Sequence, residues 1–228
     1  MEVKTVSVLT MTKSHQTRKH FRLPDEEVAN SISHGLGLVA AVAAVPVLLL
    51  TAVRDGNTSQ LIGVSVFAGS MVLLYLASTL YHSVSHGPAK RIFRLLDHSA
   101  IFLLIAGTYT PFTLGVLRGS WGWTLLALVW SLAIIGLTMK VVFGTRHSWV
   151  SISLYMAMGW LALIAVRPIW LQVPLQGILL ILAGGVAYTA GVGFFAAHRL
   201  RYNHFIWHLF VLLGTTCHFF AVLWYANP

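Results

Sequence analysis

The chain has 228 residues, of which 57% are hydrophobic and only 9% are charged. Because soluble domains carry roughly 25% charged residues, this composition excludes an ordinary soluble protein and predicts an integral membrane protein. The net charge of +9 does not indicate nucleic acid, because the basic residues are scattered between apolar segments. We therefore expect membrane lipids, and no nucleic acid, as partners.

Seven apolar windows are long enough to cross a bilayer as helices. They lie at about 34–53, 61–84, 97–117, 123–143, 150–166, 175–196 and 204–225. The fifth window is short and is interrupted by Gly159 and then by Arg167 and Pro168, so six spans are the main alternative. The runs are continuous rather than alternating, which favours helices over a barrel. The sequence therefore predicts an all-α transmembrane bundle of seven helices.

The first part of the chain divides at about residue 23. Residues 1–23 are polar and basic and are predicted to form a cytoplasmic tail, followed by one transmembrane domain over residues 24–226. The stretch LPDEEVANSISHG places Pro24 and three acidic residues where a helix start favours them. The first helix is therefore expected to begin ahead of its apolar window.

The lysines and arginines fall unequally on the two sides of the predicted bundle. Twelve lie on the side of the N-terminus: Lys4, Lys13, Arg18, Lys19, Arg22, Lys90, Arg91, Arg94, Lys140, Arg146, Arg199 and Arg201. The opposite side has Arg54, Arg118 and Arg167. Because short cytoplasmic loops collect basic residues, the N-terminus is predicted to be cytoplasmic and the C-terminus to lie outside.

Asp97 is the one acidic residue at a predicted span, where it opens the third window in RLLDHSAIFLLIAG. An ionisable residue in such a place is a functional hypothesis, because its burial is costly. The alternative is that Asp97 caps the third helix, since Asp is a favoured cap residue. Taken alone, Asp97 is better interpreted as a cap.

Three histidines are predicted to share a layer with Asp97. His82 ends the inward-running second span, and His204 and His208 open the seventh span from the same side. A spacing of four residues puts His204 and His208 on one helical face, with Cβ atoms roughly 5–6 Å apart. Three histidines suit zinc and leave its fourth position to water, which is the arrangement of a catalytic site. The alternative is that interfacial histidines are amphipathic anchors.

Two other side chains could serve such a zinc site. Ser78 lies one turn deeper than His82 and could hydrogen-bond a ligand, a substrate carbonyl or the water. Asp97 could hold and deprotonate the water, whose pKa zinc lowers. His218 follows in the same span as His204, but it lies roughly 21 Å further along the helix and is excluded from the site by its depth.

These motifs together resemble a known family. They are SxxxH at Ser78 to His82, Asp97, HxxxH at His204 to His208, and the stretches EEVANSISHG, LASTLYH, LDHSAIFLLIAGTYTPF and YNHFIWH. Their order and spacing are similar to the hemolysin III family, which belongs with the progestin and adipoQ receptors. The resemblance covers nearly all of residues 24–226, and it is especially marked to bacterial inner-membrane members.

The resemblance implies a seven-helix domain in the bacterial inner membrane with zinc near the cytoplasmic face. It assigns the ligands to His82, His204 and His208, with Ser78 and Asp97 close by. It also implies a link to hydrolysis of ceramide-type amides and to membrane lipid homeostasis. The roles of Glu27, Asn30 and His34, and the oligomeric state, are left open.

Three functions are compatible with these features. The first is a zinc-dependent lipid amide hydrolase in which Asp97 is the base. The second is a non-enzymatic sensor or regulator of membrane state in which zinc is structural. The third is a cytolysin, which is disfavoured because seven apolar spans leave the chain no water-soluble form.

Overall fold

The computed structural model describes residues 24–54 and 58–227. These residues form seven helical segments that are long and apolar enough to cross a membrane. The prediction of an all-α protein with seven spans is therefore confirmed for the described residues, and the alternative of six spans is not. Residues 1–23, which were predicted to form a cytoplasmic tail, lie outside the described residues.

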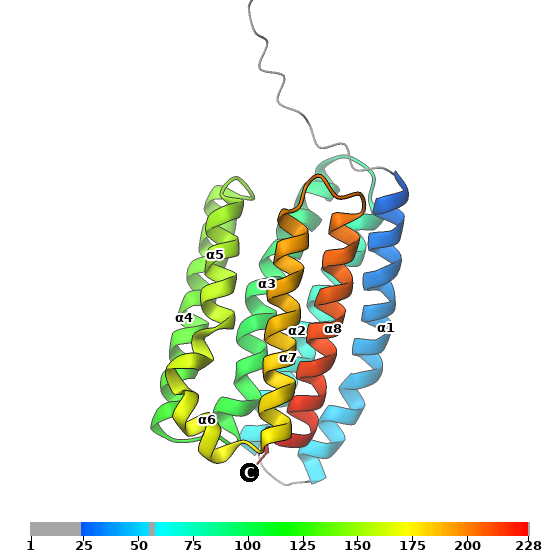
Figure 1. The fold of residues 1–228 in the computed structure, drawn as a ribbon. Coiled ribbons are helices and arrows are strands. Elements are labelled where there is room, and N and C mark those ends of the chain that lie inside the picture. The colour runs from blue at the N-terminus through cyan, green and yellow to red at the C-terminus, as the bar shows by residue number, and fades with distance from the viewer. Residues whose placement is uncertain (1–23, 55–57, 228) are drawn as a thin grey trace, which may run out of the picture.

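The helices run side by side, up and down, as one bundle (Figure 1). They are α1 (Pro24–Arg54), α2 (Thr58–Ser83), α3 (Pro88–Leu114), α4 (Ser120–Phe143), α5 (Ser148–Gly159), α6 (Val166–Gln172), α7 (Leu175–Ala196) and α8 (Asn203–Tyr225), with a 3-10 segment η1 (Leu161–Ala165) before α6. The starts of α1, α3, α5 and α8 lie at one end of the bundle, and the C-terminus lies at the other (Figure 1).

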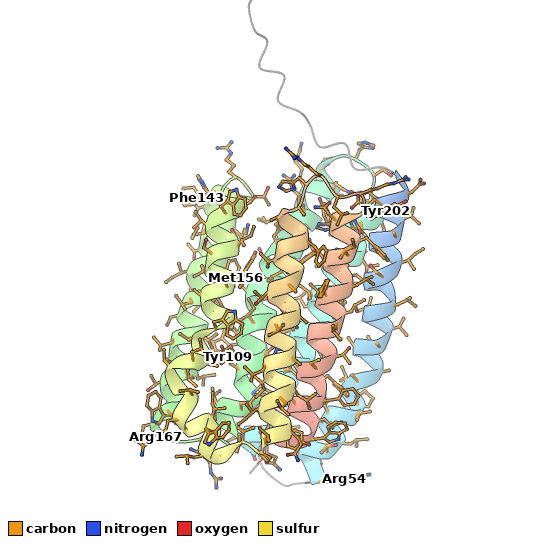
Figure 2. The ribbon with its side chains drawn as sticks, viewed as in Figure 1. Arg54, Tyr109, Phe143, Met156, Arg167 and Tyr202 are labelled. Carbon is orange, nitrogen blue, oxygen red and sulfur yellow. The ribbon has the colours of Figure 1, made fainter. Side chains whose placement is uncertain are left out.

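The fifth span is made of α5, η1 and α6 and is interrupted after Gly159. The hydroxyl of Tyr109, at mid-height of the bundle in Figure 2, donates to the Met158 carbonyl at 2.9 Å and accepts from the Ala162 amide at 3.0 Å. Pro168 lies in the first turn of α6, where its missing N–H breaks no helical hydrogen bond. Backbone groups freed by the interruption are thus satisfied inside the protein, as a membrane requires.

Two helices begin well ahead of their apolar windows. α1 begins at Pro24, as its acidic first turn predicted. α3 begins at Pro88, with Gly87 as its cap residue, so Asp97 lies roughly 13 Å along the helix from its start. The interpretation of Asp97 as a helix cap is therefore wrong, and its carboxylate is free of that structural task.

Close contacts between glycines and neighbouring helices fix how the bundle packs. A Cβ atom on Gly63 of α2 would lie 2.8 Å from the backbone Cα of Pro111 on α3. A Cβ atom on Gly184 of α7 would lie 2.6 Å from the His218 ring on α8. Small residues that let helices approach this closely are typical of membrane bundles, where packing replaces the hydrophobic effect.

The basic residues of the described chain divide unequally between the two ends. The end that holds the starts of α1 and α8 also holds seven of them: Lys90, Arg91, Arg94, Lys140, Arg146, Arg199 and Arg201. Arg54, Arg118 and Arg167 belong to the opposite end, and Figure 2 shows Arg54 and Arg167 far from Phe143 and Tyr202. The bundle therefore has one strongly basic end.

Candidate metal centre

The bundle brings three histidines together at its basic end. His82 lies in the last turn of α2, and His204 and His208 lie in the first turns of α8. All three are buried, and one ligand nitrogen from each lies within 4.8 Å of the others. Their ring centroids are 5.1, 4.9 and 4.7 Å apart. The three histidines singled out in the sequence thus form a cluster that could hold one metal ion.

A carboxylate from α1 orients His82. The Nδ1 atom of His82 lies 2.8 Å from Glu27 Oε2, and the Lys90 ammonium donates to the same oxygen at 3.0 Å. Because the carboxylate can only accept, Nδ1 of His82 carries the proton and Nε2 carries a lone pair that could bind a metal. A carboxylate placed behind a histidine in this way is the usual partner of a metal ligand.

The backbone of α1 fixes His208 in the same way. Its Nδ1 atom donates to the Asn30 carbonyl at 3.3 Å and lies 3.2 Å from Ser33 Oγ. The His34 ring stacks on the His208 ring, with centroids 3.5 Å apart and planes 7° from parallel. Because Nδ1 of His208 donates to the Asn30 carbonyl, Nε2 is the nitrogen of this ring that carries a lone pair.

Sequence reasoning missed this task of α1. The stretch from Asp25 to Glu27 was interpreted only as a helix start, and the roles of Glu27, Asn30 and His34 were left open. The signal was present in their spacing, because residues three and four apart lie on one helical face. A polar stripe on the first span, facing the histidine layer, indicates a support for that layer.

Ser78 contacts another member of the site. Its side chain is fully buried, and its Oγ atom lies 2.7 Å from His34 Nδ1. Nε2 of His34 is buried and has no hydrogen-bond partner among the described residues. The geometry therefore favours Ser78 as the residue that orients His34, while its predicted direct contact with a substrate stays a prediction.

Asp97 lies beside the histidines without belonging to the cluster. Its side chain is buried, and Oδ2 lies 3.5 Å from Nδ1 of His98. The carboxylate is also close enough to His82 and His34 for a direct charge interaction. Asp97 therefore lies near the three histidines but is not part of the group that could hold a metal ion.

A largely apolar cavity of about 390 Å³ opens from this layer. Asp97, His34, His204 and His208 line one part of it, and its walls come from α3, the fifth span, α7 and α8. Met156 and Tyr109 line it at two levels of the bundle (Figure 2). Its volume is within the roughly 300–1,000 Å³ of ligand pockets, and its apolar walls suit a hydrocarbon chain.

His218 lies away from the three-histidine cluster, as its depth predicted. Its ring stacks on Tyr188, with centroids 5.6 Å apart and planes 19° from parallel. It is not part of the metal-capable group. The depth argument therefore separated His204 and His208 of the cluster from a third histidine of the same helix.

The donor set fits a divalent transition metal. It offers three buried imidazoles, two of them with the protonated nitrogen fixed by α1. Imidazole suits zinc, copper, iron and nickel, and a set of three leaves a position for a further ligand. The neighbouring cavity gives that further ligand access.

Comparison with known proteins shows the family of this chain. Residues 23–219 match the Haemolysin-III related family. The chain belongs to this family. The family that the sequence motifs indicated is thereby confirmed.

Relatives of this haemolysin III chain occur in bacteria and animals. It is 47% identical over 203 residues to Hemolysin-3 of Bacillus cereus, which covers 89% of this chain and 93% of that protein. It is 44% identical over 200 residues to a Hemolysin-3 homolog of Bacillus subtilis (strain 168), which covers 88% and 94%. Monocyte to macrophage differentiation factor of Homo sapiens is 26% identical over 207 residues, covering 86% and 83%. No solved structure matches the chain.

Glu27→Gln should weaken metal binding roughly 10- to 100-fold, because the amide keeps the shape of the side chain but loses the charge behind His82. Competition between the purified protein and a chromogenic chelator measures this affinity. Asp25→Asn is the matched control, since Asp25 is an exposed acidic residue of the same helical turn. Equal affinities of Glu27→Gln and the unaltered protein would show that Glu27 does not support a metal ligand.

Proposed function

We propose that this haemolysin III protein is a zinc-dependent hydrolase of membrane lipids that cleaves a ceramide-type amide. One observation carries the proposal: His204, His208 and Asp97 line the same apolar cavity. A metal site, a carboxylate base and a space for a hydrocarbon chain are the three parts that such a reaction needs.

His82, His204 and His208 would hold the zinc ion. Zinc bound there supplies Lewis-acid chemistry, by which an amide carbonyl is polarised and the pKa of water is lowered. Glu27 and the Asn30 carbonyl keep the ligand nitrogens of His82 and His208 aimed at one point. The protein thus fixes the geometry before a substrate enters.

Asp97 acts as the general base that takes a proton from the attacking water. It lines the cavity, and its carboxylate is not committed to a helix cap. As the C–N bond of the amide breaks, the same group gives this proton to the nitrogen of the leaving amine. Proton transfer by a positioned side chain contributes roughly 10²–10⁴-fold to a rate.

His34 places the carbonyl that is attacked. If Ser78 donates to Nδ1, then Nε2 of His34 carries a proton, and this N–H has no partner among the described residues. A donor that lines the cavity can bind the carbonyl oxygen and stabilise the charge that develops on it. Ser78 therefore acts through His34.

The site would work at the cytoplasmic face of a bacterial plasma membrane. The Bacillus relatives support a bacterial setting, and the excess of basic residues at the end that holds the histidines supports its cytoplasmic placement. The substrate would reach this largely apolar cavity from the bilayer. Membrane lipids are therefore the partners of this protein.

Two alternatives use the same features differently. In a sensor of membrane state, zinc would only hold α2 to α8, and Asp97 would not be needed for function. The second alternative is cytolysis, which is suggested only by the name Hemolysin-3 of the Bacillus relatives. It is the weaker alternative, because seven apolar spans leave the chain no water-soluble form.

Asp97→Asn should lower the turnover of a ceramide by about 10²–10⁴-fold, because the amide cannot accept the proton, while bound zinc is retained. Release of fatty acid from a panel of N-acyl and ester lipids, followed by mass spectrometry, measures this rate. Asp25→Asn serves as the control for removal of an acidic group.

No turnover of any lipid by zinc-loaded protein would contradict the hydrolase and favour the sensor. Equal rates for Asp97→Asn and the unaltered protein would remove Asp97 from the mechanism.

The orientation can be tested with single cysteines, since Cys217→Ser leaves no native thiol. A membrane-impermeant maleimide should label Arg118→Cys, between α3 and α4, in cells whose plasma membrane is intact. It should label Arg146→Cys, between α4 and α5, only after that membrane is permeabilised. The reverse pattern would place the histidine cluster on the outer face.

A further inference from the structure

Lys140 is a buried charge that the proposed chemistry does not use. It lies in the last turn of α4, is 1% exposed and lines the cavity. Its ammonium makes no hydrogen bond or ion pair with any residue in the part of the chain that the structure describes. A buried ammonium without a partner is unfavourable, so the site is incomplete as it stands.

The carboxylates of the described chain are engaged elsewhere or lie away from Lys140. Glu27 accepts from His82 and Lys90, and Asp97 pairs with His98. The charged group that acts on the Lys140 ammonium is the guanidinium of Arg94 on α3, and this interaction is repulsive. Protein groups therefore leave an excess of positive charge at this part of the cavity.

Hydroxyl groups lie on the helix that follows α4 after a short turn. Ser148 and Ser151 of α5 both line the cavity, and Ser151 is buried. Ser148 donates to the Thr145 carbonyl at 3.2 Å and Ser151 donates to the His147 carbonyl at 3.3 Å, and either hydroxyl can rotate to donate to a ligand oxygen instead. The lining of the cavity thus includes one ammonium and two hydroxyls from α4 and α5, in addition to its many apolar side chains.

We propose that Lys140 anchors the anionic head group of a single-chain lipid whose hydrocarbon chain occupies the cavity. The head group is an oxyanion, either a carboxylate or a phosphate monoester, because both accept from an ammonium and from hydroxyls. The volume of about 390 Å³ is near the lower end of the ligand-pocket range, which favours one chain over two. The site needs neither a metal nor hydrolysis.

Binding of radiolabelled palmitate to the purified protein in detergent tests the anchor. Lysophosphatidic acid and unlabelled palmitate should each displace the label, and whichever displaces it better identifies the preferred oxyanion. Hexadecanol, which has the same chain length as palmitate but no charge, should displace it at least about tenfold less well. Equal displacement by palmitate and hexadecanol would overturn the proposal without any variant.

Substitution of the lysine locates the charge. Lys140→Met should weaken palmitate binding about tenfold or more, and Lys140→Arg should retain it. Arg146→Met is the control, because Arg146 is an exposed cation six residues further along that does not line the cavity. Unchanged binding by folded Lys140→Met would overturn the proposal.

A second pair of variants distinguishes palmitate bound in the cavity from palmitate bound on the outer surface of the bundle. Gly185 of α7 lines the cavity, and a Cβ there would meet no atom closer than 4.0 Å, so Gly185→Leu fills cavity space without a backbone clash. Gly193→Leu is the control, since Gly193 has open space around it and does not line the cavity. Loss of palmitate binding in Gly185→Leu alone supports the proposal, and unchanged binding in both would overturn it. These outcomes do not depend on whether the protein hydrolyses any lipid.

Discussion

The site depends on the contacts that the polar face of α1 makes with α2 and α8. Inside a membrane, ionisable and polar side chains need partners, because water is not available to solvate them. Glu27, Asn30 and His34 supply such partners to His82, His208 and Ser78, which belong to helices far apart in the chain. Removing the contact of Glu27 or of Asn30 would disturb both a histidine of the cluster and the packing of the first helix.

The cavity is lined by two polar regions that suit ligands of opposite charge. The histidine layer offers lone pairs to a cation, while Lys140 offers an ammonium to an anion. Both regions line one apolar space, so a lipid with a polar group at the end of its chain can satisfy either of them. The release of a carboxylate by hydrolysis at the histidine layer would create the kind of group that Lys140 is proposed to bind.

Much of this arrangement could be predicted from the sequence. Hydropathy identified seven spans, the alternating direction of these spans put His82 and His204 at one end, and the spacing of four put His208 beside His204. The start of α3 could not be found in this way, because the turns before Asp97 contain Lys90, Arg91 and Arg94 and have no apolar window. The support that α1 gives to the histidines and the burial of Lys140 depend on contacts between helices that are distant in sequence. The periodicity of hydrophobic residues along the sequence does not reveal such contacts.

Metal analysis of the purified protein tests the central claim most directly. The account predicts stoichiometric zinc in the unaltered protein and in His218→Ala, because His218 stacks on Tyr188 away from the cluster. It predicts that His82→Ala and His204→Ala both lose the metal while remaining folded. Absence of zinc from the unaltered protein, or its retention in both cluster variants, would contradict the metal centre.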